Sequence, residues 1–411
     1  MKPKRNKISK TYLNSLGLVN ALGSNQAQVV DNLNNGFAPG MKQKKSKIMG
    51  KIHYCGVVED DLPRVPQQYS NFNCRNNQLA LAAIQQIEKD IDKVKKCYGA
   101  ERVGLVIGTS TSGIQEAEQA IQEKEQKGTL PNFFDYKMQE LGAMAEFLGL
   151  YLEISGPCYS ISTACSSSGK VFASAKRLLE SDICDAVIVG GADSLCDLTL
   201  GGFDSLEAVS FEQTQPFSEN RKGINIGEGA AMFLMTKEKK IGSCDNYLEE
   251  DNPIILLGVG ETGDAYHMSA PEPNGKGAIA AMECALNEAE LKPENIDYIN
   301  LHGTGTKLND AMEARAIKQL FGQKAVCSST KPFTGHTLGA AGATEVAICW
   351  ILLNCSEKKL LAPHVYDGNY DKEIDEINLA SDSFSNNKIL TTMSNSFAFG
   401  GNNVSVILGL E

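Results

Sequence analysis

The stretch from Cys158 to Leu179 constrains the fold of this chain more than any other. It begins with alternating residues of strand character and continues through uniformly small side chains from Thr163 to Gly169. Helical spacing follows, with apolar residues at Val171 and Ala175. The pattern predicts a strand, a tight turn and a helix, with Cys165 at the turn.

A cysteine at such a turn is well placed to act as a nucleophile. The unpaired backbone N–H groups and the positive end of the helix dipole favour an anion, so we expect the Cys165 thiol to ionise more easily than a free thiol. The same N–H groups can hold the oxyanion that forms when sulfur attacks a carbonyl. The alternative is a small buried apolar residue, which is the commoner role of a cytosolic cysteine, and this stretch alone does not decide between them.

The charge balance limits the possible partners. The 411 residues include 39 basic and 50 acidic side chains, and the formal net charge of -11 argues against a nucleic-acid binder. The 12 cysteines include no CxxC pair, which favours a reducing cytoplasm over a disulfide scaffold.

The longest apolar run, 346–353, is too short to cross a bilayer, and polar residues interrupt the apolar segment that follows the basic N-terminus. We therefore expect neither membrane insertion nor export.

Strand and helix patterns alternate along the chain and restart after a charged run at 236–252. Strand patterns occur at 11–19, 103–107, 186–189, 254–259 and 296–301, and helix patterns at 76–91 and 277–289. The alternation predicts a layered α/β fold with mostly parallel strands and two similar halves, with the reactive groups between them. The small-residue loop at 108–113 matches neither GxGxxG nor GxxxxGK[ST], so we predict no nucleotide site.

Two of the five histidines lie in glycine-rich turns at the ends of predicted strands. His302 begins HGTGT, and His336 lies within KPFTGHTLGAAG. Glycines leave room for a ligand to approach an imidazole, although each histidine alone is more often a hydrogen-bonded structural residue. Together with Cys165 the pair favours a catalytic site. A zinc site is not favoured, because no cysteine and histidine here have ligand spacing.

Four motifs follow one another in the order known from one enzyme family. They are TACSSS around Cys165, HGTGT from His302, KPFTGHTLGAAG from Lys331, and NSFAFGGNN from Asn395 to Asn403. Together they resemble the condensing enzymes of the β-ketoacyl-acyl-carrier-protein synthase I/II type, within the thiolase superfamily. The resemblance implies a five-layered αβαβα thiolase-like fold, with residues 1–250 carrying the nucleophile and 251–411 the histidines. It also implies a homodimer, or a heterodimer with a related subunit, served by acyl carrier protein.

The resemblance implies a two-stage condensation at Cys165. The thiolate would take an acyl group from a carrier-protein thioester, which divides one difficult step into two. A malonyl thioester would then lose CO2, while His302 and His336, both neutral, donate hydrogen bonds to the enolate oxygen. The enolate carbon would attack the acyl group, whose oxyanion would rest on the backbone N–H groups of Cys165 and Phe399.

Further residues receive roles from the resemblance alone. Lys331 and Glu345 are expected to orient His336. No metal ion and no cofactor of the chain's own is expected, since the 4′-phosphopantetheine belongs to the carrier protein. The remaining assignments are Thr304, Thr306 and Ser269 for the pantetheine arm, and Thr111, Phe203 and Phe399 for the acyl pocket, with Phe399 as its gate.

The chain departs from the common family pattern at several positions. Ala398 replaces a glycine, which should stiffen the gate loop, and Asn402 replaces a threonine. Glu207 replaces an arginine that docks the carrier protein, so we expect the docking surface elsewhere, for example at the basic run 42–51. Thr111 replaces a bulky aliphatic residue, which predicts a roomier or more polar acyl pocket.

The amino-acid sequences of segments 220–229, 267–271 and 349–353 resemble those of synthases from aryl-polyene-type pathways, which extend conjugated chains. Two other functions are open. A non-catalytic chain-length-type partner subunit of a heterodimeric synthase would share the fold, but such subunits usually lose the reactive cysteine. A cysteine hydrolase needs one base and an orienting Asn or Asp, and it does not explain two histidines together with Lys331.

Overall fold

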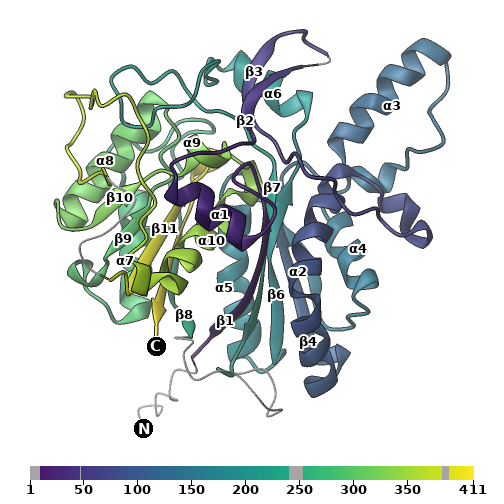
Figure 1. Ribbon diagram of the computed structural model, residues 1–411, viewed down its shortest axis with the longest axis horizontal. Coiled ribbons are helices and arrows are strands. Elements are labelled where there is room, and N and C mark those ends of the chain that lie inside the picture. The colour runs from purple at the N-terminus through teal and green to yellow at the C-terminus, as the bar shows by residue number, and fades with distance from the viewer. Residues whose placement is uncertain (1–9, 47, 240–252, 382–387) are drawn as a thin grey trace.

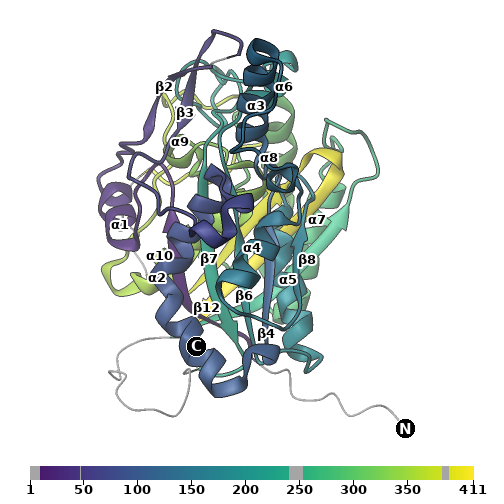
Figure 2. The ribbon, with the colours of Figure 1, turned by 90° about the vertical axis from the view of Figure 1, so that its right-hand side faces the viewer.

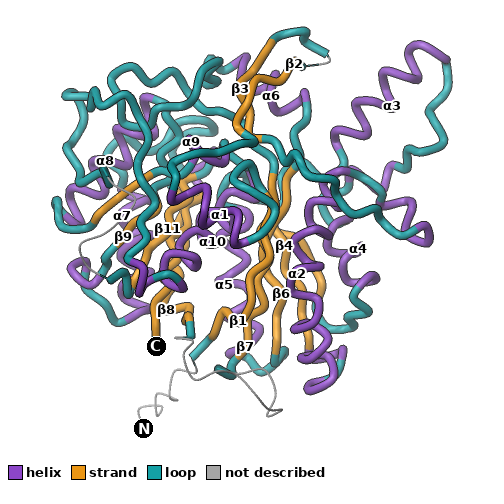
Figure 3. The backbone as a smooth tube through the Cα atoms, in the orientation of Figure 1, coloured by secondary structure: helices purple, strands orange, loops and turns teal. Residues whose placement is uncertain are grey.

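Ten strands form the central sheet of the computed structural model, which describes residues 10–46, 48–239, 253–381 and 388–411 (Figure 1). Their order across the sheet is β10-β9-β11-β12-β8-β1-β7-β6-β4-β5. Figure 3 shows these strands in the middle of the molecule with helices on either side. The ten strands are β1 (Tyr12–Val19), β4 (Val103–Gly108), β5 (Cys158–Ile161), β6 (Ala186–Asp193), β7 (Gly229–Thr236), β8 (Ile254–Gly263), β9 (Tyr298–Asn300), β10 (Val326–Ser328), β11 (Thr391–Phe397) and β12 (Asn402–Leu410).

The sheet consists of two five-stranded halves with the same topology. When the strands of each half are numbered in chain order, both halves read 3-2-4-5-1 from the outer edge to the middle. The first strands of the two halves, β1 and β8, pair antiparallel where Tyr12 meets Ile255. Most of the predicted junction at 236–252 lies outside the described residues, so the division between residues 250 and 251 stays a prediction.

The prediction of mostly parallel strands is wrong. Only the outer strands of each half run parallel, and five of the nine neighbouring pairs are antiparallel. β11 and β12, for example, are joined through residues 398–401. This connection is too short for the crossover that parallel strands need, so the two strands pair as a hairpin. Apolar patterns identify strands but do not fix their direction.

Two buried helices, α5 and α10, lie between the half-sheets, and other helices cover the outer faces (Figures 1 and 2). α10 is buried on every side from Ala341 to Leu353, and most of these residues are apolar, as is typical of an interior helix. A Cβ on Gly342 of α10 would lie 2.6 Å from the backbone N of Gly169 in α5, so the glycines let the two helices cross closely. The helices are α1 (Gln26–Asn34), α2 (Arg75–Tyr98), α3 (Ile114–Lys127), α4 (Ala143–Tyr151), α5 (Ser167–Glu180), α6 (Asp197–Ser205), α7 (Lys276–Ala289), α8 (Lys307–Phe321), α9 (Lys331–Thr334) and α10 (Ala341–Asn354).

On the outside, α2 and α4 pack on the first half-sheet, and α7 packs on the second (Figure 2). A separate hairpin of β2 (Met41–Lys45) and β3 (Ile52–Gly56) stands beside α6, and α3 projects from the body (Figure 1). No helix in the described part of the chain is both long and apolar enough to cross a membrane.

The topology brings the motifs of the second half to one edge of the sheet. β9, β10 and β11 are parallel neighbours, so the residues that follow them lie close together. His302 follows β9, Lys331 follows β10 and Phe399 follows β11. Because α5 lies between the halves and begins at Ser167, it carries Cys165 to the same place.

Candidate active site

Cys165 lies in the tight turn between β5 and α5, as the sequence predicts. The preceding Ala164 has a φ of 53°, a left-handed conformation that costs a non-glycine residue about 1–3 kcal/mol. Ser167 holds the turn in this shape. Its hydroxyl donates to the Ala164 carbonyl oxygen at 2.6 Å and accepts from the Thr163 N–H at 2.8 Å. The sulfur is thereby presented at the N-terminal end of α5.

His302 and His336 lie beside Cys165, so three separate segments meet in space. The Nε2 atom of His336 lies 3.0 Å from the sulfur. The two imidazole ring centres are 5.4 Å apart, and the rings are nearly perpendicular at 87°. All three residues are buried and line one cavity of about 650 Å³.

The hydrogen-bond partners of the two rings fix their tautomers. The Nδ1 atom of His336 accepts the backbone N–H of Leu338 at 3.2 Å. The Nδ1 atom of His302 lies 3.4 Å from the ammonium group of Lys331, which can only donate. Both rings therefore carry their proton on Nε2, which makes both Nε2–H groups hydrogen-bond donors.

Lys331 contacts His302 rather than His336, and Glu345 holds Lys331 there, which corrects the expectation from the sequence. The Lys331 ammonium contacts both Nδ1 and the backbone carbonyl oxygen of His302, and it forms a buried ion pair with Glu345. The reason is the sheet, since β10 leads into Lys331 directly beside the end of β9. Nearness in the sequence to His336 suggested the wrong ring.

Both imidazoles are held in the neutral form. Burial lowers the pKa of His336 well below its usual value, and the charge of Lys331 lowers it further. The pKa of His302 falls in the same way through burial, then Lys331, then His336. Neutral rings with protonated Nε2 atoms can donate to a developing oxyanion.

The predicted ease of ionisation of Cys165 is wrong. Burial raises the pKa of the thiol to about 11, although Lys331 and the backbone N–H groups of Phe399 and Cys165 act in the opposite direction. The sulfur is therefore protonated before it reacts. The backbone N–H groups of Phe399 and Cys165 can hydrogen-bond the sulfur anion, and N–H groups at this position can also serve a bound oxyanion.

Cys165, His302 and His336 also form a donor set of the kind that binds zinc, with their candidate ligand atoms within 4.8 Å of one another. A metal ion needs a nitrogen lone pair, and here both Nε2 atoms carry the proton. In the other tautomer the Nδ1 atom would carry the proton. It would then face another donor, the Leu338 N–H at His336 or the Lys331 ammonium at His302. The arrangement favours hydrogen bonding to an oxyanion over metal binding.

The gate residue Phe399 packs against Phe203 on the cavity wall, with ring centres 5.6 Å apart. Its loop follows β11 and turns through Gly400, which has a φ of 80°. Asn402, at the start of β12, accepts a hydrogen bond from Lys170 of α5 at 3.0 Å. The unusual Asn402 thus ties the gate loop to the nucleophile helix.

Three residues assigned to the pantetheine arm line the same cavity. The hydroxyls of Thr304 and Thr306 lie 2.9 Å apart, and the hydroxyl of Ser269 contacts the Nδ1 atom of His267. Glu207, Lys222 and Lys307 line it as well and are exposed. The cavity therefore runs from the buried sulfur to the surface, as access for a long substrate arm requires.

Two family models match the chain. Residues 40–240 match the N-terminal domain of beta-ketoacyl synthase, and residues 254–364 match its C-terminal domain. The chain belongs to the β-ketoacyl synthase family. Its condensing activity is that of a 3-oxoacyl-acyl-carrier-protein synthase, an acyltransferase.

This synthase is 32% identical over 346 residues to 3-oxoacyl-[acyl-carrier-protein] synthase 2 of Coxiella burnetii, covering 80% of this chain and 81% of that protein. It is 44% identical to a chain in the structure of the ketosynthase ApeO with its chain length factor ApeC from Xenorhabdus doucetiae, with a TM-score of 0.91 and full coverage of both chains. The ishigamide ketosynthase/chain length factor, at 22% identity, 98% and 99% coverage and a TM-score of 0.85, shares the fold.

Thr111 does not line the cavity of the synthase, although the sequence places it in the acyl pocket. It is buried, and its hydroxyl donates to Asp193 at 2.9 Å. The hydroxyl that makes Thr111 unusual therefore has a partner within the protein. Its effect on the accepted chain stays a prediction.

Sequence reasoning missed Glu313, a buried carboxylate on α8. It accepts the backbone N–H groups of His302 and Gly303, each at 2.7 Å, and so holds the turn that carries the first histidine. Burial raises its pKa to about 8. The available signal was a glutamate between the small and apolar residues Met312 and Ala314 shortly after HGTGT, but its target depends on the tertiary fold.

Proposed function

We propose that this synthase condenses an acyl group held on Cys165 with a malonyl group held on a carrier protein. The observation that carries the proposal is the meeting of Sγ with two Nε2–H donors at the buried end of one cavity. In the first stage the sulfur attacks the thioester carbonyl of the acyl carrier protein. The new C–S bond forms, the bond to the pantetheine sulfur breaks, and the thiol proton leaves with that sulfur. The N–H groups of Cys165 and Phe399 hold the oxyanion.

In the second stage a malonyl thioester occupies the cavity and loses CO2. The electron pair of the broken C–C bond forms an enolate, whose oxygen accepts from the Nε2–H groups of His302 and His336. The enolate carbon attacks the acyl carbonyl, and the Cys165 sulfur leaves as a thiolate. The thiolate then takes up a proton, since its pKa is about 11. The product is a β-ketoacyl group on the carrier protein.

The test is acylation and condensation by the purified enzyme with acyl and malonyl carrier proteins. Intact mass should show one acyl group on the wild type and none on the Cys165→Ala variant, which should also form no β-ketoacyl product. A Cys165→Ala variant that still condenses would overturn the proposal. Release of free acid as the main product would indicate a hydrolase, and a wild type that is never acylated, even with a partner, would indicate a non-catalytic chain-length subunit.

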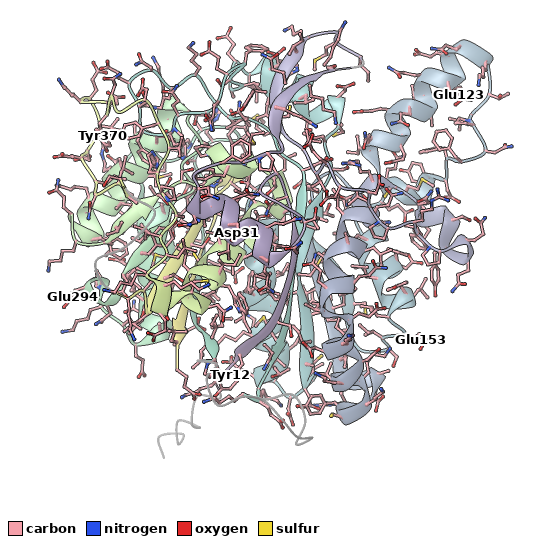
Figure 4. The ribbon with its side chains drawn as sticks, in the orientation of Figure 1. Tyr12, Asp31, Glu123, Glu153, Glu294 and Tyr370 are labelled. Atoms are coloured by element: carbon pink, nitrogen blue, oxygen red, sulfur yellow. The ribbon has the colours of Figure 1, made fainter. Side chains whose placement is uncertain are left out.

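We propose a dimer with a related, chain-length-type subunit as the working form. This partner is supported by the similarity of the synthase to a chain of the ApeO–ApeC complex, in which a ketosynthase is bound to its chain length factor. β5 ends the described sheet as an edge strand, which offers backbone groups for pairing. α3 projects from the body of the molecule, with Glu123 on the projecting helix (Figure 4). Exposed apolar side chains on α3 and the segment after it are Ile121, Leu130, Phe133, Tyr136 and Leu141.

We further propose that the synthase extends a conjugated, aryl-polyene-type chain in the cytoplasm. The segments 220–229, 267–271 and 349–353, which resemble synthases of that type, support this substrate class. The carrier protein would dock at the cavity mouth, where Lys222 and Lys307 are exposed. Acylation of Cys165 by a panel of saturated and conjugated acyl carrier proteins, measured by intact mass, tests the choice of chain.

A further inference from the structure

Asp193, at the end of β6, is a buried carboxylate that the two stages above do not use. Its Oδ1 atom accepts hydrogen bonds from the backbone N–H groups of Ser110 and Thr111 at 2.8 and 2.9 Å. The same oxygen accepts from the hydroxyls of Thr109 and Thr111 at 2.7 and 2.9 Å. Its Oδ2 atom accepts the backbone N–H of Gly339 at 2.5 Å.

Oδ2 also accepts the Ser110 N–H at 3.1 Å, so the carboxylate as a whole joins the two halves of the molecule. Oδ1 holds the loop after β4 in the first half. Oδ2 reaches across to Gly339 in the second half, next to Leu338. The Leu338 N–H is the group that donates to Nδ1 of His336. The carboxylate therefore lies one residue away from the donor that fixes the tautomer of His336.

The fit between Asp193 and Gly339 is tight. A Cβ at position 339 would lie 2.8 Å from Oδ2 of Asp193 and 2.5 Å from the hydroxyl of Ser110, so a side chain there would push the partners apart. Leu338 has a φ of 52°, a left-handed conformation that surrounding contacts must maintain. The hydrogen bond from Gly339 is such a contact, placed directly after the strained residue.

We propose that Asp193 is a positioning residue that keeps the Leu338 N–H on Nδ1 of His336, and so keeps the Nε2–H of His336 available to the enolate. The inference rests on the proposed condensation and assigns Asp193 to its second stage. In the first stage the oxyanion rests on the N–H groups of Cys165 and Phe399, which are not partners of Asp193.

The Asp193→Asn variant separates the two stages because it keeps the shape of the side chain. We expect the amide oxygen to take the place of Oδ1, because more donors point to that position. The NH2 group then faces the Gly339 N–H, and two donors cannot form a hydrogen bond with each other. We expect CO2 release from malonyl carrier protein by the acylated enzyme to fall about 10- to 100-fold, the effect typical of an outer hydrogen-bond partner. Acylation of Cys165 should change less than about threefold.

Two further variants are compared with Asp193→Asn. Thr109→Val removes a donor to Oδ1 and keeps the Gly339 bond, so it should leave the ratio of CO2 release to acylation unchanged. Gly339→Ala breaks the contact from the other side and should lower the ratio, which keeps the inference testable if Asp193→Asn does not fold. Ring ¹⁵N shifts of His336, assigned with His336→Ala, should show an Nε2-protonated ring in the wild type and a mixture in Asp193→Asn.

Equal losses in both stages, or no loss in either, would overturn the role of Asp193. A wild type that neither becomes acylated nor releases CO2 would overturn the proposed condensation instead. The two failures are therefore distinguishable.

Discussion

At Cys165, burial raises the pKa of the thiol, while Lys331 and the backbone N–H groups of Phe399 and Cys165 lower it. Burial is the larger influence and raises the pKa to about 11. The proton therefore stays on the sulfur until the substrate arrives and can accept it on the leaving pantetheine sulfur. A thiol that remains protonated also resists oxidation, since the thiolate is the form that oxidants attack. The nucleophile is protected between turnovers by the same burial that raises its pKa.

This pKa predicts the pH dependence of alkylation. Below its pKa, a thiol gains about tenfold in thiolate per pH unit, so the rate at which iodoacetamide modifies Cys165 should keep rising about tenfold per unit from about pH 7 to about pH 10. Mass spectrometry of the Cys165 peptide measures the rate, with glutathione as a reference thiol. A Cys165 rate that levels off near pH 8 would contradict the raised pKa.

Lys331 holds His302 through its ammonium group, so the Lys331→Met variant should lose the correct tautomer of that ring. We expect CO2 release from malonyl carrier protein to fall about 100-fold, as for the loss of one oxyanion donor. The free energy of unfolding should fall by about 3 kcal/mol, because Glu345 loses its buried partner.

The matched variant is Glu345→Gln, which leaves the ammonium on His302 and should reduce CO2 release less than Lys331→Met. Burial raises the pKa of Glu345 to about 7 even beside Lys331. Without the lysine the carboxyl group should take up a proton, which limits the loss of stability at low pH. Wild-type CO2 release by Lys331→Met would refute the assignment to His302.

Among the elements, α8 has the clearest role at the cavity mouth. Its first turn presents Lys307 and Leu308, which are both exposed and line the cavity. The basic run at 42–51, the other candidate for docking, lies on the β2–β3 hairpin, where Lys42 pairs with Glu59 and Lys51 with Asp204. Lys47 lies outside the described residues. We propose docking at the mouth rather than on this hairpin, because a pantetheine arm would enter the cavity there.

A charge reversal at Lys307 tests this docking. Lys307→Glu should raise the KM for acyl carrier protein about tenfold, because rim charges act mainly on association with a charged partner. The reaction with a small acyl thioester that lacks the carrier protein should not change. Lys324→Glu is the control, because this exposed lysine lies past the other end of α8, a helix roughly 22 Å long. Equal effects of the two variants would argue against docking at the mouth.

In the assembly, the edge strand β5 is the element through which we propose that two subunits pair. The carbonyl oxygens of Pro157 and Ile161 accept bonds from the neighbouring strand segment, so the N–H of Ser160 points to the open edge by strand alternation. Ser160→Pro removes this outward donor and should convert the dimer to a monomer. Light scattering gives the native mass, and circular dichroism checks the fold. A native mass unchanged from wild type would exclude pairing through β5.

Much of the architecture follows from local patterns in the sequence. The small residues around Cys165 predict the turn, and the glycines around His302 and His336 predict open turns at the ends of strands. The restart of the strand and helix rhythm predicts two similar halves, which the repeated topology confirms. These features depend on neighbours in the chain, which is why the sequence reveals them.

Other features depend on residues far apart in the chain. The direction of the strands, the choice of His302 by Lys331, and the bonds of Glu313 to His302 and Gly303 all arise where separate segments meet. The pKa of Cys165 depends on how deeply the finished fold buries the sulfur. Local spacing carries no information on these contacts, so the sequence indicated the participants but not all of their partners.

A single-turnover reaction follows the proposed transfer of the acyl group from Cys165 to the malonyl carrier protein. The enzyme is first acylated on Cys165, separated from excess substrate and mixed with malonyl carrier protein, and the intact masses of both proteins are followed over time. We expect the acyl mass to leave the enzyme as the carrier gains that acyl group and loses CO2, in equal amounts. Loss of the acyl group as free acid, with the malonyl carrier protein unchanged, would contradict it.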